Sequence, residues 1–167
     1  MSYTITRTTT GEFDVVVARV KEALKAEGFG VLTEIDVAGT LKAKIGKDFR
    51  PYRILGACNP TYAFEALSEE PHIGVMLPCN VIAQRFDNGA VEVSSIDPAT
   101  AMQSVGNTRL EGVARKVRDA LSRVVSSLSR AGMGPGALGA LERGRDQLKA
   151  DQAPAANAAL TSTGQAR

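Results

Sequence analysis

The sequence predicts an α+β fold in which helices pack on one face of an antiparallel sheet. Three observations predict it: segments with an apolar period of two alternate with segments of helical period, Asn88-Gly89 separates two β-type runs, and a long amphipathic helix follows. An Asn-Gly pair in this setting is typical of a tight hairpin, which requires antiparallel pairing. The expected order is strand, helix, two strands, short helix, two strands, long helix, and this order favours an α+β fold over a parallel sheet.

The first three elements follow from a change of period near Gly11. "YTITRTTT" alternates β-branched or aromatic residues with polar ones and predicts a strand from Tyr3. Helical spacing then predicts a helix that ends near Gly28, with the apolar positions Phe13, Val16, Val17, Val20 and Leu24. "VLTEIDV", residues 31–37, alternates again and predicts a second strand, whereas "TLKAKIGKDFRP", residues 40–51, is interpreted as an irregular basic segment.

The middle of the chain predicts a strand, a short helix and a hairpin. "YRILGACN" predicts a third strand, and Asn59-Pro60 is a helix-start signal because Asn caps free amides and Pro is tolerated at the first helical position. The short helix should stop at Pro71. In the apolar run "IGVMLPCNVIAQRF", Pro78 should delay regular pairing to about Cys79, since proline cannot donate to a central ladder. "AVEVSSID" supplies the last strand.

The final helix is expected from Leu110 to about Ser129. Its apolar stripe predicts that a sheet grips it, with Leu121 and Val117 central; the stripe comprises Leu110, Val113, Ala114, Val117, Leu121, Val124, Val125 and Leu128. Beyond it the composition turns rich in Ala, Gly and Pro. We therefore expect one domain over residues 1–130 and a flexible tail over residues 131–167.

Composition excludes several classes of protein. The 167 residues carry a net charge of +2, which does not favour nucleic acid, with 10 Lys and Arg against 13 Asp and Glu in residues 1–108. A basic face on the last helix lacks interleaved aromatic residues and is interpreted as an ordinary solvated face; it comprises Arg115, Lys116, Arg118, Arg123 and Arg130. No apolar run is long enough to span a membrane, and "MSYTITRTTT" lacks a signal-peptide core. A cytoplasmic protein is expected.

The two cysteines form the candidate site. Cys58 in "GACNP" and Cys79 in "LPCN" are both followed by Asn. If the third and fourth strands pair antiparallel, the end of one lies beside the start of the other, which would make the two thiols neighbours near the Pro60 helix. Amides at that helix start would favour a Cys58 thiolate. The competing interpretation is that both are small buried apolar residues, since free cysteine is among the most buried residue types.

Other chemistry finds little support in the residues. Zinc usually takes four ligands, and the chain offers two Cys and a single His, His72, in a spacing that is not diagnostic, so no metal site is assigned. There is no phosphate-binding glycine loop and no nucleophile elbow. The sequence names no cofactor.

Three phrases carry a resemblance. "YRILGACNP", "HIGVMLPCNVIA" and "GFGVLTEIDVAGTLKAKIG" resemble the bacterial and archaeal family catalogued as domain of unknown function 302, over about Tyr3 to Leu128. The resemblance implies a small α+β domain similar to the helix-grip arrangement, and members that are soluble and often dimeric. It brings no established activity. The positions that match the two cysteine phrases are Cys58, Asn59, Pro60, Pro78, Cys79 and Asn80.

Several functions stay open from the sequence. Cys58 and Cys79 could act together in redox, sulfur or soft-metal handling, which requires thiols within reach of each other. Alternatively, the fold could be a small-molecule binding module whose apolar pocket is lined by the cysteines, which requires a cavity. A homodimerisation or interaction domain without catalysis is the third hypothesis. Whether the protein is an enzyme is not decided.

Overall fold

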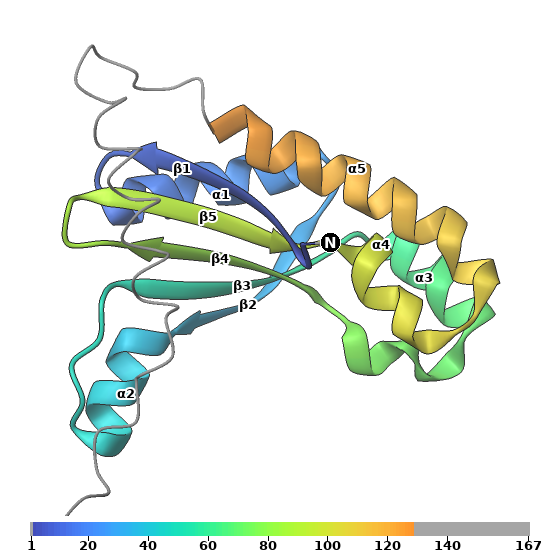
Figure 1. Ribbon diagram of the computed structural model, residues 1–167, viewed down its shortest axis with the longest axis horizontal. Coiled ribbons are helices and arrows are strands. Elements are labelled where there is room, and N and C mark those ends of the chain that lie inside the picture. The colour runs from blue at the N-terminus through green and yellow to red at the C-terminus, as the bar shows by residue number, and fades with distance from the viewer. Residues whose placement is uncertain (1, 129–167) are drawn as a thin grey trace, which may run out of the picture.

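The computed structural model describes residues 2–128, which form a five-stranded sheet with helices (Figure 1). Every pair of neighbouring strands is antiparallel, and the order across the sheet is β1-β5-β4-β3-β2. β1 and β2 are therefore the two edges. The strands are β1 (Thr4–Thr10), β2 (Gly30–Asp36), β3 (Tyr52–Cys58), β4 (Cys79–Arg85) and β5 (Ala90–Ile96).

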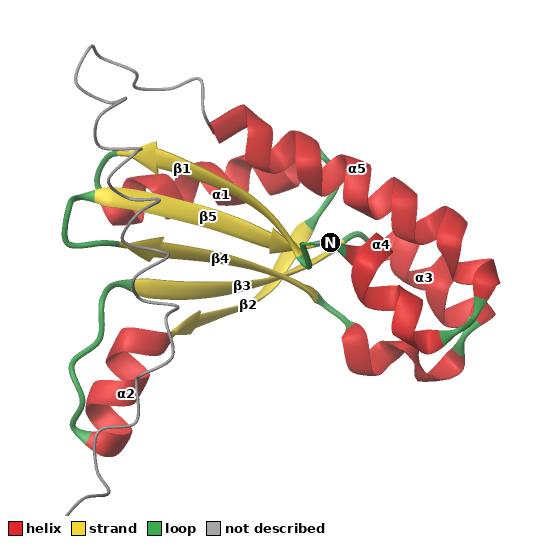
Figure 2. Cartoon of the chain, in the orientation of Figure 1, coloured by secondary structure: helices red, strands yellow, loops and turns green. Residues whose placement is uncertain are grey.

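Helices α1 (Phe13–Ala26) and α5 (Glu111–Ser127) cover one face of the sheet. Helix α3 (Pro60–Glu69) packs beside α5 beyond the ends of the strands (Figure 2). Helix α2 (Val37–Ile45) projects beyond the β2 edge. The short helix α4 (Pro98–Ala101) and three 3-10 turns connect the remaining elements, at Pro71–Met76, Met102–Val105 and Thr108–Leu110.

The core lies between the sheet and the covering helices. Leu24 of α1, Leu55 of β3 and Leu121 of α5 are each fully buried in one continuous apolar cluster. The cluster takes its helical members from the stripes that the sequence shows at a spacing of three and four residues, and its strand members from alternate positions. Burying these stripes is what joins α1 and α5 to the sheet.

The predicted α+β class is confirmed, and most boundaries agree with the sequence. β4 begins at Cys79, directly after Pro78, and α3 begins at Pro60. The hairpin between β4 and β5 turns at Asn88-Gly89, where Gly89 has a φ of 81°, a left-handed value that favours glycine. Residues 129–167, which include the predicted tail, lie outside the described residues.

Helix α2 corrects the sequence interpretation of residues 40–51 as irregular. Asp36 caps it by accepting a hydrogen bond from the Gly39 amide at 3.0 Å, and Gly46 ends it in a left-handed conformation. Its apolar positions Val37, Leu41 and Ile45 recur at helical spacing, but no residue of α2 is buried. The weak signal in the sequence reflects this, because the helix packs little of itself against its own domain.

The basic face of α5 is engaged in ion pairs. Lys116 lies 3.1 Å from Glu65 of α3, and Arg123 lies 2.8 Å from Glu27. Arg118 donates to the buried carboxylate of Asp97 at 3.1 Å, so it contributes more than a solvated surface residue would. Arg130 lies outside the described residues.

Replacing Leu121 with Ala should lower the free energy of unfolding by about 2–5 kcal/mol, because the side chain is fully buried in the core. Arg115→Ala, on an exposed side chain of the same helix, should change it by less than about 0.5 kcal/mol. Urea unfolding followed by circular dichroism measures both. Equal losses in the two variants would contradict the assigned face of α5.

Candidate functional site

The first cysteine motif joins a strand to a helix. β3 ends at Cys58, and the side chain of Asn59 accepts hydrogen bonds from the amides of Thr61 and Tyr62, at 3.1 and 3.3 Å. Pro60 occupies the first position of α3, where a missing N–H costs nothing. The motif therefore builds the turn that aims α3 across the end of the sheet.

The second motif begins the neighbouring strand. The Leu77–Pro78 peptide bond is cis, and Cys79 opens β4. The register pairs Cys79 with Ala57 and Asn80 with Gly56. The two cysteine phrases therefore lie side by side in the sheet.

Glycines allow the close approach of the two motifs. A Cβ atom added to Gly56 would lie 2.8 Å from Cγ of Pro78 and would also collide with the Thr33 side chain. A Cβ atom on Gly28, whose φ is 81°, would lie 2.9 Å from Nδ2 of Asn59. A side chain at position 56 would therefore displace the ring of Pro78, and the left-handed φ at position 28 favours glycine.

The prediction that Cys58 and Cys79 are neighbouring thiols is wrong. Ala57, not Cys58, lies opposite Cys79, and the partner of Cys58 is Gly30 on the other side of β3. The register therefore offsets Cys58 by one residue from the position opposite Cys79, so the two thiols do not stand side by side as a pair. Both are free cysteines.

An apolar cavity lies at the junction of the two motifs. The strand ends supply Cys58, Asn59 and Cys79, while α3 and α5 supply the opposite walls. The volume open to the centre of a water-sized molecule is about 20 Å³, so the cavity is small. The lining is Phe29, Ala57, Cys58, Asn59, Tyr62, Ala63, Ala66, Leu77, Cys79, Met102, Val113 and Val117.

The candidate residues divide into two groups around this cavity. Cys58, Asn59 and Cys79 line it, whereas Pro60, Pro78 and Asn80 do not. The two prolines set the backbone on either side, and Asn80 is exposed because it follows the inward-facing Cys79 in an alternating strand. The six positions thus form a framework for the cavity rather than a single cluster of reactive groups.

Both thiols are held in the neutral form. Burial, and to a smaller extent the charge of Cys58, raise the pKa of the Cys79 thiol to about 11. Burial also raises the pKa of the half-buried Cys58 thiol. The expected lowering of the Cys58 pKa by the helix amides is therefore not observed, since Asn59 lies between the thiol and the first free amides and its side chain already occupies two of them.

Metal chemistry has no assembled ligand set in the described residues. Among residues 2–128, no group of three or more His, Cys, Asp and Glu side chains is arranged to hold an ion. The His72 side chain is exposed and lies 3.5 Å from the carboxylate of Glu70.

Several cavity residues were not predicted as part of the site. Val113 and Val117 belong to the predicted stripe of α5, so the stripe placed them in the core but not at a cavity. Tyr62 and Ala66 follow from the helical spacing of α3, counted from Asn59. Met102 lies in a short turn after α4, and nothing in its sequence neighbourhood indicates that it faces the cysteines.

Gly56→Ala should destabilise the protein by about 1–3 kcal/mol, because the added methyl group forces Pro78 and Thr33 apart. Gly112→Ala provides a matched control on α5, where an added Cβ has nothing within 4 Å; it should be neutral or stabilise the helix by up to about 1 kcal/mol. Thermal and urea unfolding distinguish the two. A tolerated Gly56→Ala would show that the motifs do not need this close contact.

The raised pKa of Cys79 makes stability depend on alkaline pH. The thiol ionises near 9 when unfolded and near 11 when folded, so its contribution is complete below pH 9 and is lost as pH rises toward 11. This loss should amount to about 2–3 kcal/mol. Urea unfolding at several pH values should show a shallower alkaline decline in Cys79→Ala than in the unsubstituted protein, and parallel declines would refute the assignment.

Comparison with known proteins supports the fold and the family. A search of curated proteins found no match. A crystal structure described as an uncharacterised conserved protein DUF302 from Bacillus stearothermophilus is similar, with a TM-score of 0.72 and 27% sequence identity. The match covers 77% of this chain and 99% of the other. Residues 5–128 match the family described as domain of unknown function DUF302, and the chain therefore belongs to that family.

Proposed function

We propose that the protein is a small-molecule binding module whose ligand places an apolar group in the cavity at the two cysteine motifs. The observation that carries the proposal is the convergence of both motifs, α3 and α5 on one largely apolar cavity. Ligand sites are concave, mainly apolar and equipped with few polar groups. Here Asn59 and the two thiols are the polar groups of the lining, together with the hydroxyl-bearing ring of Tyr62.

Recognition by shape and soft contact fits the thiols better than covalent chemistry. A thiolate is the nucleophilic form of cysteine, and burial keeps both thiols protonated. A neutral thiol behaves as a small, polarisable apolar group. The cysteines therefore serve as part of the wall.

The volume of the cavity limits the size of a ligand group that can enter without moving the lining side chains. About 20 Å³ of room for molecular centres holds one water-sized group. A larger group would require side chains to move, and Met102 is the unbranched, flexible member of the lining. We infer that the ligand either inserts a short apolar tip or displaces Met102.

We further propose that the protein acts as a homodimer in the cytoplasm. Free cysteines at both positions suit a reducing compartment. No helix among residues 2–128 is long and apolar enough to cross a bilayer. Leu32 and Ile35 of the edge strand β2 and Ile45 of the adjoining α2 are exposed apolar side chains, which supports association between copies.

Binding of a small apolar probe tests the proposed cavity. Benzene or indole titrated into isotopically labelled protein should shift the amide resonances of Ala66 on α3 and Val113 on α5, which both line the cavity. Met102→Ala should enlarge the cavity and tighten benzene binding about tenfold, since an apolar cavity of sufficient size binds such a molecule.

Substitutions of Ala with Leu supply the matched comparison. Ala63→Leu adds bulk to the cavity from a half-buried position and should weaken benzene binding at least about tenfold. Ala18→Leu, on an exposed position of α1, should leave it unchanged. Shifts that persist in Ala63→Leu, or that map away from the cavity, would refute the site.

A further inference from the structure

We propose that two copies pair through their β2 edges, so that helix α2 of each copy packs on helix α3 of the other. The inference rests on the proposed homodimer and specifies its surface; it does not depend on the proposed ligand. The proposed interface, the β2 arm surface, has two parts in each copy. The first part is β2, α2 and Phe49, and the second part is α3.

The β2 edge is open and carries two exposed apolar side chains. β2 pairs with β3 alone in the described residues, so its outer backbone groups lack a strand partner there. Its sequence, Gly30–Asp36, contains no Lys, Arg or Pro; of its two acidic residues, Glu34 pairs with Lys21 and Asp36 caps α2, and its pairing with β3 shifts register between Val31 and Thr33. Leu32 is 66% exposed and Ile35 is 46% exposed. The opposite edge, β1, instead consists mainly of threonines.

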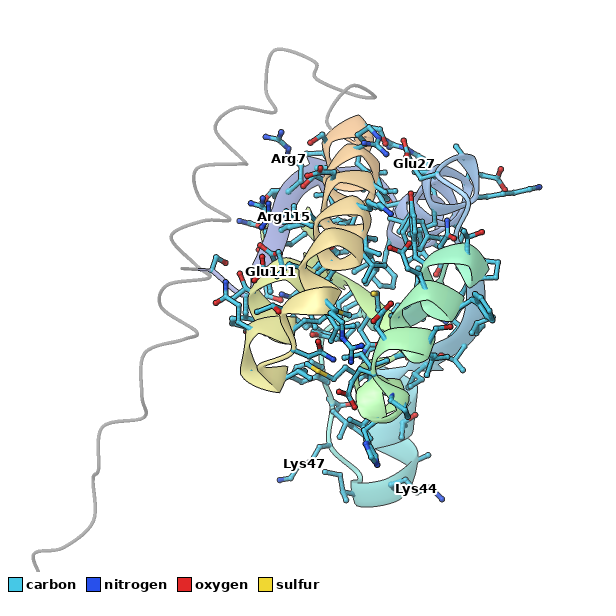
Figure 3. The ribbon with its side chains drawn as sticks, turned by 90° about the vertical axis from the view of Figure 1, so that its right-hand side faces the viewer. Arg7, Glu27, Lys44, Lys47, Glu111 and Arg115 are labelled. Atoms are coloured by element: carbon cyan, nitrogen blue, oxygen red, sulfur yellow. The ribbon has the colours of Figure 1, made fainter. Side chains whose placement is uncertain are left out.

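Helix α2 lacks a cover of its own. It runs for nine residues, and a helix that short is marginal in water unless one face packs against something. None of its residues is buried, and Ile45 remains 63% exposed. Figure 3 shows Lys44 and Lys47 at the far end of this arm, directed away from the body of the domain. Val37 and Leu41 are half-buried and Ile45 is exposed, so the apolar stripe leaves surface that a partner can cover.

The register of the sheet identifies what a second copy would bring to the arm. Antiparallel pairing of β2 with itself about a two-fold axis places the end of one strand, at Asp36, beside the start of the other, at Gly30. Gly30 pairs with Cys58, and α3 begins two residues later at Pro60. Since α2 begins immediately after Asp36, it would start beside the partner copy's α3.

The two helices are complementary in charge and in apolar surface. Residues 37–47 hold three Lys and no acidic residue, whereas residues 60–70 hold three Glu and no basic residue. Glu65 and Glu69 already contact Lys116 and Arg109 within the copy, but their side chains remain partly exposed. Phe64 of α3 is 75% exposed and offers the apolar contact that α2 lacks. A self-complementary surface of this kind suits a second copy of the same chain.

The test measures the mass of the full chain in solution by light scattering after gel filtration. The unsubstituted protein should be a dimer. Leu32→Lys/Ile35→Lys should weaken dimerisation at least about 100-fold, because two charged side chains would have to leave water at the seam in each copy. Val15→Lys, on an exposed apolar position of α1, is the matched control and should remain dimeric. Circular dichroism should show each variant folded, since all three positions are exposed.

Charge reversal separates the α2–α3 contact from edge pairing. Lys44→Glu/Lys47→Glu should weaken dimerisation about tenfold or more, and Glu65→Lys/Glu69→Lys combined with it should restore the dimer. The dimer should also protect Cys58, so that an alkylating reagent modifies it faster in the Leu32→Lys/Ile35→Lys variant.

The outcomes separate the two proposals. A monomeric unsubstituted protein would overturn both the homodimer and this surface. A dimer that survives the β2 substitutions, or that Val15→Lys disrupts equally, would overturn the surface alone. Failure of the charge swap to restore the dimer would overturn the packing of α2 on α3.

Discussion

The contact between Gly56 and Pro78 is the constraint on which the site depends. It lets the turn before β4 lie directly on β3, which brings the two cysteine motifs together at one end of the sheet. With that contact made, the register follows, and the register decides that Ala57 and Cys79 face the helices together. The cavity is the space left where α3, aimed by Asn59, crosses this junction.

The same arrangement explains why the cysteines are chemically quiet. Cys79 faces the core, where desolvation disfavours its thiolate, and Asn59 uses its side-chain oxygen on the amides that could otherwise have stabilised a Cys58 anion. A capping residue and a thiolate compete for the same donors at a helix start. In this chain the side chain of the capping residue, Asn59, accepts hydrogen bonds from these donors. The motif therefore stabilises the start of the helix and does not activate the thiol.

Local signals predicted the fold well because they depend on few residues. The stripes of α1 and α5, the cap at Asn59 and the start of β4 after Pro78 each follow from short-range chemistry. The face of the sheet toward which a strand residue points does not follow from such short-range chemistry. Whether Ala57 or Cys58 lies opposite Cys79 depends on contacts such as that of Gly56 with Pro78, and a slip of one residue reverses the face of every side chain. Helix α2 was missed for a different reason, since its own domain does not bury it.

Helix α2, which has no core of its own, follows the end of β2, whereas the cavity at the start of α3 lies beside the beginning of β2. Pairing about a two-fold axis would bring the α2 helix of one copy close to the cavity of the other. Cys58 and Asn59 stand where β3 meets α3, next to Gly30 at the beginning of β2. The arm of a second copy would begin beside that point and add Val37 and Ala38 to its surroundings. The rim of each cavity would then include residues from both copies, so that a ligand reaching beyond the cavity would contact the partner. Dimer formation and ligand binding would in that case be linked, each favouring the other by the same factor.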